Sequence, residues 1–463
     1  MAVKGKRQVP HVLAVPFPAQ GHVLPLMKLC RRIASRGIKV TFVNTEYIHA
    51  KVLAAMSEDD KKQNPIQLIS IPDGLPAEDD RSVGFELMES VRRTMPENLA
   101  NLIKKINGQN SDEKITCVIA DITVGWIFDV TKKLGAESVA FQSAAAAGMA
   151  MILQIPKLIQ AGNLDINGSV MKNELINLSD NIPPWRRNKL SWSFPGDLKT
   201  QTIVFECFMD AAKTAHHATW LLCNTFYEIE SSACNLIPNL LPVGPFLSTN
   251  KSKSSSIGGS FWPEDTTCFS WLDEQPIGSV IYVSFGSIAV FSQEQLNELA
   301  LALELSGRPF LWVVRSNLAN GSHVKYPNGF QERVSKRAKI VEWAPQEKVL
   351  AHSSIACFLS HCGWNSTMEG LSMGVPFLCW PYFSDQFHNQ NYICDVWKIG
   401  LRLNPNKNGL RSRHEIMTKI EMLLSDYGIK ANAVKLKEMA LKSVSGYGSS
   451  SQNFETFIDS LKN

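Results

Sequence analysis

The stretch "FLSHCGWNSTMEGLSMGVPFLCWP", residues 358–381, joins an apolar strand, a tight turn and a helix. The strand ends at Ser360, and the helix begins near Asn365. Gly363 lets the chain turn sharply between them because it has no Cβ. A second apolar run, residues 376–381, follows the helix. This order of elements predicts one repeat of a parallel sheet covered by helices.

The same alternation of apolar strands and amphipathic helices extends along both halves of the chain. In the N-terminal half we predict strands at 11–17, 39–45 and 116–122, and a helix at 22–37. In the C-terminal half we predict strands at 279–287, 309–314, 339–345 and 355–361, and a helix at 292–307. Between the halves, a segment rich in Ser, Gly, Lys and Pro marks a linker.

The pattern therefore predicts an α/β protein of two Rossmann-like, doubly wound parallel-sheet domains that face a cleft. We place these domains at residues 1–245 and 266–440, joined by a linker at 246–265. In open parallel sheets, ligands bind outside the carboxyl ends of the strands, so the functional residues are expected there.

Composition excludes several classes of protein. Of the 463 residues, 44% are apolar and 19% are charged, which is typical of a folded globular protein. The formal net charge is only +4 and no dense basic stripe occurs, so we expect no nucleic-acid partner. The ten cysteines form no CxxC pair, which argues against a zinc site or a redox motif. Free buried thiols in a reducing compartment are expected instead.

No leader or membrane span is predicted. The apolar run at 11–17 is broken by Pro16 and Pro18 and is too short for the core of a secretory signal. The longest apolar stretch, 139–153, is interrupted by Gln142 and Ser143. We therefore expect a cytoplasmic location, and we take the protein to be a monomer.

The turn around His361 has the composition of an anion site. Asn365 and Ser366 are residue types that favour helix N-termini, where backbone N–H groups and the helix dipole attract anions. With His361 and Gly363 in the same turn, a phosphate group is the ligand that suits this site best. In the alternative, Asn365 and Ser366 only cap the helix.

A longer segment, Trp343 through Gln386, reads "WAPQEKVLAHSSIACFLSHCGWNSTMEGLSMGVPFLCWPYFSDQ". These 44 residues resemble the signature box of plant UDP-dependent glycosyltransferases (glycosyltransferase family 1). The resemblance extends to "PFPAQGH", residues 16–22, and to "VSFGS", residues 283–287. It implies the glycosyltransferase B fold, with the acceptor bound in the N-terminal half and the nucleotide sugar in the C-terminal half. It also implies that residues 441–463 form a last helix that packs back on the first domain.

The resemblance implies a donor-binding role for many positions. Those expected at the uracil and ribose are Trp343, Ala344, Gln346 and Glu369. Those expected at the diphosphate are Ser287, His361, Gly363, Asn365 and Ser366. Those expected at the sugar or its phosphate are Ser143, Trp364, Asp385 and Gln386. Each has a plainer alternative, because a lone Trp is most often a core residue and the polar residues are common in turns and on solvated helices.

His22 and Asp121 are the candidate catalytic residues. His22 follows the first predicted strand, and an imidazole titrates near neutrality, as a general base must. Asp121 ends the strand at 116–122 and would orient the imidazole. Taken alone, His22 would be a loop residue and Asp121 a helix cap. The resemblance gives His22 the role of base.

The implied reaction is inverting transfer of glucose from UDP-glucose to a hydroxyl of a small acceptor. No Asp-x-Asp motif occurs, so we expect no metal and no further cofactor. A nicotinamide-dependent oxidoreductase is disfavoured, because no G-x-G-x-x-G follows the first strand. A nucleotide-sugar-binding protein without activity is the other alternative.

The acceptor is the part that the sequence defines least. Phenolic, flavonoid and terpenoid acceptors are the usual substrates of the family. Residues near the predicted cleft that would line the acceptor pocket are Phe17, Gln20, Phe141, Met149, Phe205 and Phe383. Each of these is also a natural core residue or structural residue.

Overall fold

The computed structural model describes residues 10–79, 81, 84–109, 113–172, 175–247, 259–319 and 324–462. The chain forms two compact units. Unit 1 comprises residues 1–188, 192–262 and 443–463, and unit 2 comprises residues 189–191 and 263–442. Much of the predicted linker, residues 248–258, lies outside the described residues.

Unit 1 contains a seven-stranded parallel sheet. Its spatial order is β3 (Gln67–Ile71), β2 (Lys39–Thr45), β1 (His11–Val15), β4 (Cys117–Asp121), β5 (Glu137–Gln142), β8 (Trp220–Cys223) and β9 (Leu240–Pro242). The central strands are buried along their whole length, as expected for a sheet covered on both faces. The strand order reverses between β1 and β4. This reversal is the position at which open α/β sheets bind ligands.

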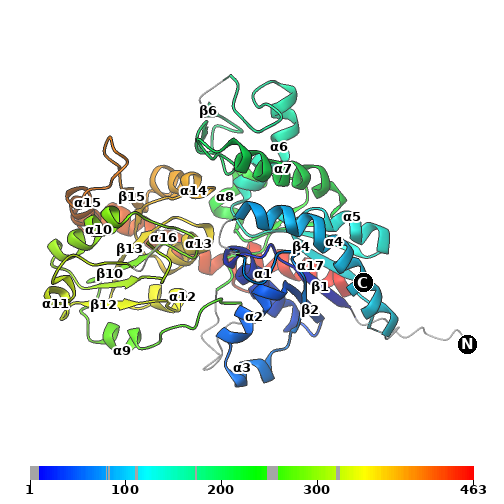
Figure 1. Ribbon diagram of the computed structural model, residues 1–463, viewed down its shortest axis with the longest axis horizontal. Helices are drawn as coiled ribbons and strands as arrows, with labels where there is room; N and C mark the ends of the chain where they lie inside the picture. The colour runs from blue at the N-terminus through cyan, green and yellow to red at the C-terminus, as the bar shows by residue number, and fades with distance from the viewer. Residues whose placement is uncertain are drawn as a thin grey trace, which may run out of the picture. The chain divides into compact units, whose positions relative to one another are not determined.

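The helices of unit 1 pack around this sheet. They are α1 (Gln20–Ala34), α2 (Glu46–Ala55), α3 (Glu58–Gln63), α4 (Gly84–Gln109), α5 (Ile127–Leu134), α6 (Ala146–Gln160), α7 (Leu198–Thr214), α8 (Tyr227–Cys234) and α17 (Ser449–Lys462). Figure 1 shows α17, in red, among the blue elements of unit 1. Its Phe454 and Phe457 are buried in the same core cluster as β1 and α1. The guanidinium of Arg32 lies 4.2 Å from the Phe454 ring centroid. The last segment of the chain thus belongs to the first unit.

Unit 2 repeats the architecture with a six-stranded parallel sheet. Its order is β12 (Ala338–Val341), β11 (Phe310–Val313), β10 (Val280–Ser284), β13 (Ile355–Ser360), β14 (Phe377–Cys379) and β15 (Gly400–Arg402). Its helices are α9 (Cys268–Asp273), α10 (Gln293–Leu305), α11 (Phe330–Val334), α12 (Gln346–Leu350), α13 (Trp364–Met373), α14 (Gln386–Asn391), α15 (Arg413–Ser425) and α16 (Tyr427–Ser443). Here the strand order reverses between β10 and β13. The predicted alternation of parallel strands and helices is confirmed in both units.

Element boundaries differ from the prediction where proline intervenes. The first strand stops at Val15 rather than Phe17, because Pro16 and Pro18 have no N–H to donate to a neighbouring strand. The following helix starts at Gln20, so that His22 lies in a helical first turn. A two-stranded antiparallel sheet, β6 (Leu175–Ile176) with β7 (Trp185–Arg186), was not predicted. Among the described residues, no helix is long and apolar enough to cross a membrane.

Candidate active site

In unit 1, His22 and Asp121 come together at the strand reversal. β1 leads through a short turn into α1, whose first turn carries His22, and the neighbouring β4 ends on Asp121. His22 Nδ1 lies 2.8 Å from Asp121 Oδ2. The side chain of His22 is 28% exposed, whereas that of Asp121 is completely buried. The pair therefore presents an imidazole to solvent and keeps its carboxylate beneath the surface.

Asp121 uses its two oxygens for different purposes. Oδ1 accepts hydrogen bonds from the Thr123 N–H at 3.0 Å and from the Thr123 hydroxyl at 2.6 Å, which caps the short 3-10 helix Ile122–Val124. Oδ2 accepts from His22. Both sequence interpretations of Asp121, helix cap and histidine partner, thus hold at once.

These contacts keep Asp121 ionised. Desolvation by burial raises the pKa of the carboxyl, but attraction to His22 and hydrogen bonds from His22 and Thr123 outweigh it, and the net pKa is lowered. A carboxylate can only accept, so Nδ1 of His22 carries a proton. The lone pair of the imidazole is then on Nε2, where a general base needs it.

Ser143 is a third member of this cluster. Its Oγ lies 3.0 Å from His22 Nδ1 and donates to Asp121 Oδ2 at 3.1 Å. The sequence resemblance placed Ser143 at the sugar or phosphate, but in unit 1 its contacts are with the histidine and the aspartate. It follows β5, the strand next to β4, so the sheet register brings it to Asp121.

In unit 2, His361 occupies the equivalent reversal, at the end of β13. Its ring is enclosed by two glycine turns: a Cβ at Gly286 would lie 2.6 Å from Nε2, and one at Gly363 would lie 2.4 Å from the same atom. Burial of the ring lowers the pKa of His361 to about 4, although a hydrogen bond with the Ser284 backbone acts in the opposite direction. At neutral pH His361 is therefore an uncharged hydrogen-bonding group.

The N-terminus of α13 beside His361 has no side-chain cap. Its N-cap is Gly363, which offers no oxygen to the first backbone N–H groups. Asn365 is half-buried and Ser366 is buried within the first turn. The anion site and its helix-capping alternative both stay predictions. A helix start without a cap retains its capacity to bind an anion.

The expected ribose residues of unit 2 form one hydrogen-bonded group. Gln346 Nε2 donates to Glu369 Oε2 at 2.8 Å and to Ser366 Oγ at 2.7 Å. The amide oxygen of Gln346 accepts from the Tyr282 hydroxyl at 3.3 Å. The amide of Gln346 thus holds Ser366 and Glu369, which lie 20 and 23 positions further along the chain.

The expected sugar-contacting residues are tied to the phosphate turn through Asn389. Asn389 is fully buried, and its Nδ2 donates to Asp385 Oδ2 and to the Cys362 carbonyl, both at 2.9 Å. Gln386 accepts the Tyr382 N–H at 2.8 Å and also the Phe383 N–H, so its amide oxygen holds the local loop. Asp385 therefore has a fixed position relative to the turn that contains His361.

The remaining donor positions differ in exposure. Trp343 and Ser287 are half-buried, and Ala344 is buried. Trp364 is only 4% exposed, and its ring packs against that of Trp397, with centroids 6.3 Å apart. Trp343 is thus the more exposed of these two tryptophans.

The six predicted acceptor residues have different surroundings. Phe141, Met149 and Phe205 are fully buried core side chains of unit 1. Gln20 accepts the Phe261 N–H at 2.9 Å, which is a structural contact. Phe383 lies in unit 2, half-buried beside Tyr382. Phe17 has its ring in edge contact with His22 at 5.3 Å, and Phe141 is the neighbour of Asp121 in the sheet register.

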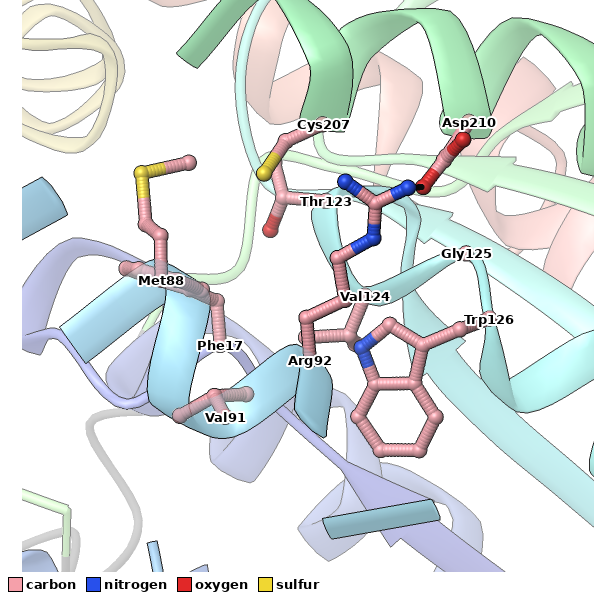
Figure 2. Close-up of a pocket in the computed structure, with 10 residues that line it drawn as sticks. All are labelled: Phe17, Met88, Val91, Arg92, Thr123, Val124, Gly125, Trp126, Cys207 and Asp210. Carbon is pink, nitrogen blue, oxygen red and sulfur yellow. Dashed lines mark ion pairs between the residues drawn. The ribbon is translucent and has the colours of Figure 1, made fainter. Parts of the chain in front are cut away.

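A small pocket of unit 1 (Figure 2) is lined by two residues that contact the His22–Asp121 pair, Phe17 and Thr123. Its apolar lining consists of Phe17, Met88, Val91, Val124 and Trp126. Its polar lining consists of Arg92, Thr123, Cys207 and Asp210, with Gly125 completing the wall. Sequence reasoning found only Phe17 among these residues, because α4 and α7, which supply most of the others, carry no motif.

Comparisons with known proteins assign the family. Residues 8–219 match the family described as glycosyltransferase, N-terminal domain, and residues 262–442 match UDP-glucoronosyl and UDP-glucosyl transferase. UDP-glycosyltransferase 83A1 of Arabidopsis thaliana is 42% identical, over 98% of this chain and 97% of that protein. The chain belongs to the plant UDP-glycosyltransferase family.

Solved structures agree with the assignment of this UDP-glycosyltransferase. Os79 from O. sativa in complex with UDP is 26% identical over 97% of this chain and 100% of that chain, with a TM-score of 0.82. Phytolacca americana UGT2, complexed with UDP-2fluoro-glucose and pterostilbene, is 25% identical over 98% and 100%, with a TM-score of 0.80. These similarities confirm the predicted family and the predicted glycosyltransferase B fold.

Three residues of the UDP-glycosyltransferase site were not predicted from sequence. Thr123 binds Asp121, and its D-x-T spacing is a capping pattern that could have been noticed. Asn389 lies four residues after Asp385, a spacing that places both on one helix face. Tyr282 left no signal, since it lies inside a buried strand.

The described residues were also compared with the requirements of a metal site. Within the described ranges, no group of three or more His, Cys, Asp or Glu side chains is arranged to hold a metal ion. The expectation that the reaction needs no metal stays a prediction.

Two buried histidines predict that unit 2 is destabilised by acid. Burial lowers the pKa of His361 to about 4 and that of His388 to about 3. An unfolded chain protonates both near pH 6.5, whereas the folded unit keeps both neutral, so their stabilising contribution is complete above pH 6.5 and decreases as the pH falls towards 3. We expect each histidine to remove about 1.4 kcal/mol of stability per pH unit as the pH falls from about 6.5 to its own folded-state pKa.

Urea unfolding at pH 7 and pH 4.5 measures this effect. His388→Asn should reduce the difference in unfolding free energy between the two pH values. His414→Asn, at an exposed position, is the matched control and should leave the difference unchanged. Equal pH dependence in the wild type and in His388→Asn would refute the prediction.

Proposed function

We propose that this UDP-glycosyltransferase transfers glucose from UDP-glucose to a hydroxyl of a small hydrophobic acceptor, with inversion, to give a β-glucoside and UDP. The observation that carries the proposal is the 2.8 Å hydrogen bond between His22 Nδ1 and Asp121 Oδ2. A partly exposed imidazole oriented by a buried carboxylate is the arrangement of a general base. Glucose and an aromatic acceptor are supported by the relative that was crystallised with UDP-2fluoro-glucose and pterostilbene.

The chemical step is a single displacement. The acceptor oxygen attacks the anomeric carbon of glucose from the face opposite the diphosphate, and a new C–O bond forms. The bond between the anomeric carbon and the β-phosphate oxygen breaks, and UDP leaves with its electron pair. The hydroxyl proton passes to Nε2 of His22, and Asp121 stabilises the resulting imidazolium. Attack from the opposite face accounts for inversion.

Unit 2 would bind UDP-glucose through uncharged hydrogen-bonding groups and the dipole of a helix. We assign the diphosphate to the uncapped start of α13, with Asn365, Ser366 and the neutral His361 beside it. Fixed donors of this kind stabilise the charge that develops on the leaving diphosphate. The group Gln346–Glu369 would bind the ribose, and Asp385 with Gln386 would bind the sugar hydroxyls. The half-buried Trp343 would stack on the uracil.

Gly286→Ala is expected to weaken UDP binding about ten-fold or more. Gly286 has a φ of +66°, which disfavours a Cβ, and the added atom would meet His361 Nε2 at 2.6 Å. The imidazole would have to move away from its position beside the proposed diphosphate site. Titration of the purified variant with UDP, followed by calorimetry, measures the change.

Gly307→Ala is the matched control for this variant. Gly307 has nearly the same φ, +65°, but a Cβ added there would meet nothing within 4 Å. It carries the same backbone strain without the contact to His361. UDP affinity that falls equally in both variants would show that strain alone is responsible and would remove His361 from the phosphate site.

The function is tested by supplying UDP-glucose together with phenols and terpenoid alcohols. Mass spectrometry should detect a product heavier than its acceptor by one hexose, with release of one UDP per product. NMR of the anomeric proton should show the β configuration. Binding of UDP-glucose with neither adduct nor UDP release, across the whole panel, would instead favour a nucleotide-sugar-binding protein without activity.

We also propose a cytoplasmic location for the enzyme. All ten cysteines are free thiols, and most of them are buried. Such usage suits a reducing compartment. Imaging of the full chain fused to a fluorescent protein would test the location.

A further inference from the structure

We propose that Arg315 is a positioning residue of the donor site: its buried guanidinium fixes the loop beside His361 and supplies a positive charge that favours binding of the diphosphate. The inference rests on the proposed function, because it takes the start of α13 as the diphosphate site. It adds a residue that the sequence motifs do not include.

Arg315 is a buried cation whose partners are all uncharged. It follows β11, and only 3% of the residue is exposed. Its guanidinium donates to the Ala289 carbonyl at 2.6 Å and to the side-chain oxygen of Asn317. Among the described residues it forms no ion pair with a carboxylate. Burial lowers the pKa of Arg315 to about 10, so the group still carries its charge at neutral pH.

A buried cation without a counter-ion costs free energy. Arg81 of unit 1 shows the usual solution, because its side chain is also only 5% exposed but is paired with Asp73 at 3.2 Å. The described part of unit 2 offers Arg315 no such acid. An anionic ligand that binds near Arg315 would supply the missing negative charge.

The contacts of Arg315 lead to the proposed diphosphate site. β10 pairs with both β11 and β13, so the three strands end at one edge of the sheet. Ala289, which accepts from Arg315, belongs to the loop after β10 that also contains Gly286 and Ser287. Gly286 lies against His361, since a Cβ there would meet Nε2 at 2.6 Å. The charge of Arg315 also reaches His361 and helps to lower the pKa of that imidazole.

Three ligands that share a base and a ribose but differ in charge test this role: uridine, UMP and UDP. Arg315→Gln removes the positive charge but keeps a side-chain donor for the Ala289 carbonyl. We expect its affinity to fall by about ten-fold or more for UDP and by about three-fold for UMP, and to stay within about two-fold for uridine. Calorimetry on the full chain at pH 7.5 measures UDP directly and the weaker ligands by displacement of UDP.

Two further variants separate charge from structure. Arg315→Lys keeps the charge, and its affinity for UDP should stay within about three-fold of the wild type. Arg337→Gln is the matched control. Arg337 is a half-buried arginine of unit 2 that also donates to carbonyls, among them that of Glu304 at 2.7 Å, but it precedes β12 at the opposite edge of the sheet. It should keep all three wild-type affinities.

Urea unfolding without ligand provides a readout that is independent of binding. Because the charge of Arg315 has no counter-ion in the free protein, Arg315→Gln should be at least as stable as the wild type. A less stable Arg315→Gln, equal losses for uridine and UDP, wild-type UDP affinity in Arg315→Gln, or an equal loss in Arg315→Lys would each overturn the inference. Wild-type protein that binds UDP no more tightly than uridine would remove the diphosphate site as well. Glucose transfer, assayed separately, decides the proposed function.

Discussion

His22→Ala is expected to lower kcat by about 10²–10⁴-fold, the usual contribution of a general base. The imidazole is the group of the Asp121 cluster that is exposed to solvent, and the alanine side chain cannot accept a proton. Affinity for UDP should not change, because the residues that we assign to UDP are all in unit 2. Steady-state kinetics with UDP-glucose and an accepted phenol measure kcat, and calorimetry measures UDP binding.

His217→Ala is the control for this variant. His217 also faces an aspartate in unit 1, with 3.4 Å between His217 Nδ1 and Asp129 Oδ1, but in this surface pair the carboxylate is 56% exposed, whereas Asp121 is buried. Its removal should leave kcat within about two-fold, since we assign it no part in proton transfer. Asp121 keeps its hydrogen bonds from Thr123 and Ser143 in His22→Ala, so the variant should fold. Unchanged kcat in a folded His22→Ala would rule out the assigned base.

Asp121→Asn is expected to reduce kcat by a similar factor, on the order of 10²–10⁴, for a different reason. Because Thr123 keeps an oxygen acceptor at the other position, the asparagine NH2 would face His22 Nδ1 and donate a hydrogen bond where the carboxylate accepts one. The imidazole must then carry its own proton on Nε2, the atom that should receive the acceptor proton. The stabilisation of the imidazolium by the buried carboxylate is lost as well.

The pH profile distinguishes this mechanism from a loss of structure. With the carboxylate gone, the imidazolium is less stable and forms only at lower pH, so the acidic limb of the residual activity should shift to lower pH. Asp129→Asn removes the carboxylate of the surface pair and should alter neither kcat nor the profile. A folded Asp121→Asn with wild-type kcat and profile would contradict the assigned role.

Much of the candidate site was accessible from sequence because it follows the ends of strands. His22 and Asp121 are 99 positions apart, yet each follows a short apolar run, and parallel strands place such positions at one edge of the sheet. His361 follows the same rule in unit 2. The family resemblance then selected these residues among many others that also follow strands.

Residues that act through another side chain were harder to predict. Ser143 joins the catalytic pair only because β5 pairs with β4. Asn389 links Asp385 to the Cys362 carbonyl from within a helix, where an asparagine is ordinary. The acceptor candidates stay a prediction: Phe141 lies near the end of β5, Met149 and Phe205 lie in α6 and α7, and all three side chains are buried, which the packing of helices on the sheet decides.

The sequence alone determined the α/β class, the repeated parallel sheets and the edge of each sheet at which the candidate functional residues lie. It did so because hydrophobic periodicity and turn residues act over a few positions along the chain. Only the tertiary structure decided which oxygen of Asp121 faces His22 and that Ser143 donates to the same oxygen. Those properties depend on hydrogen bonds and fields between residues far apart in sequence, and no local pattern encodes such distances.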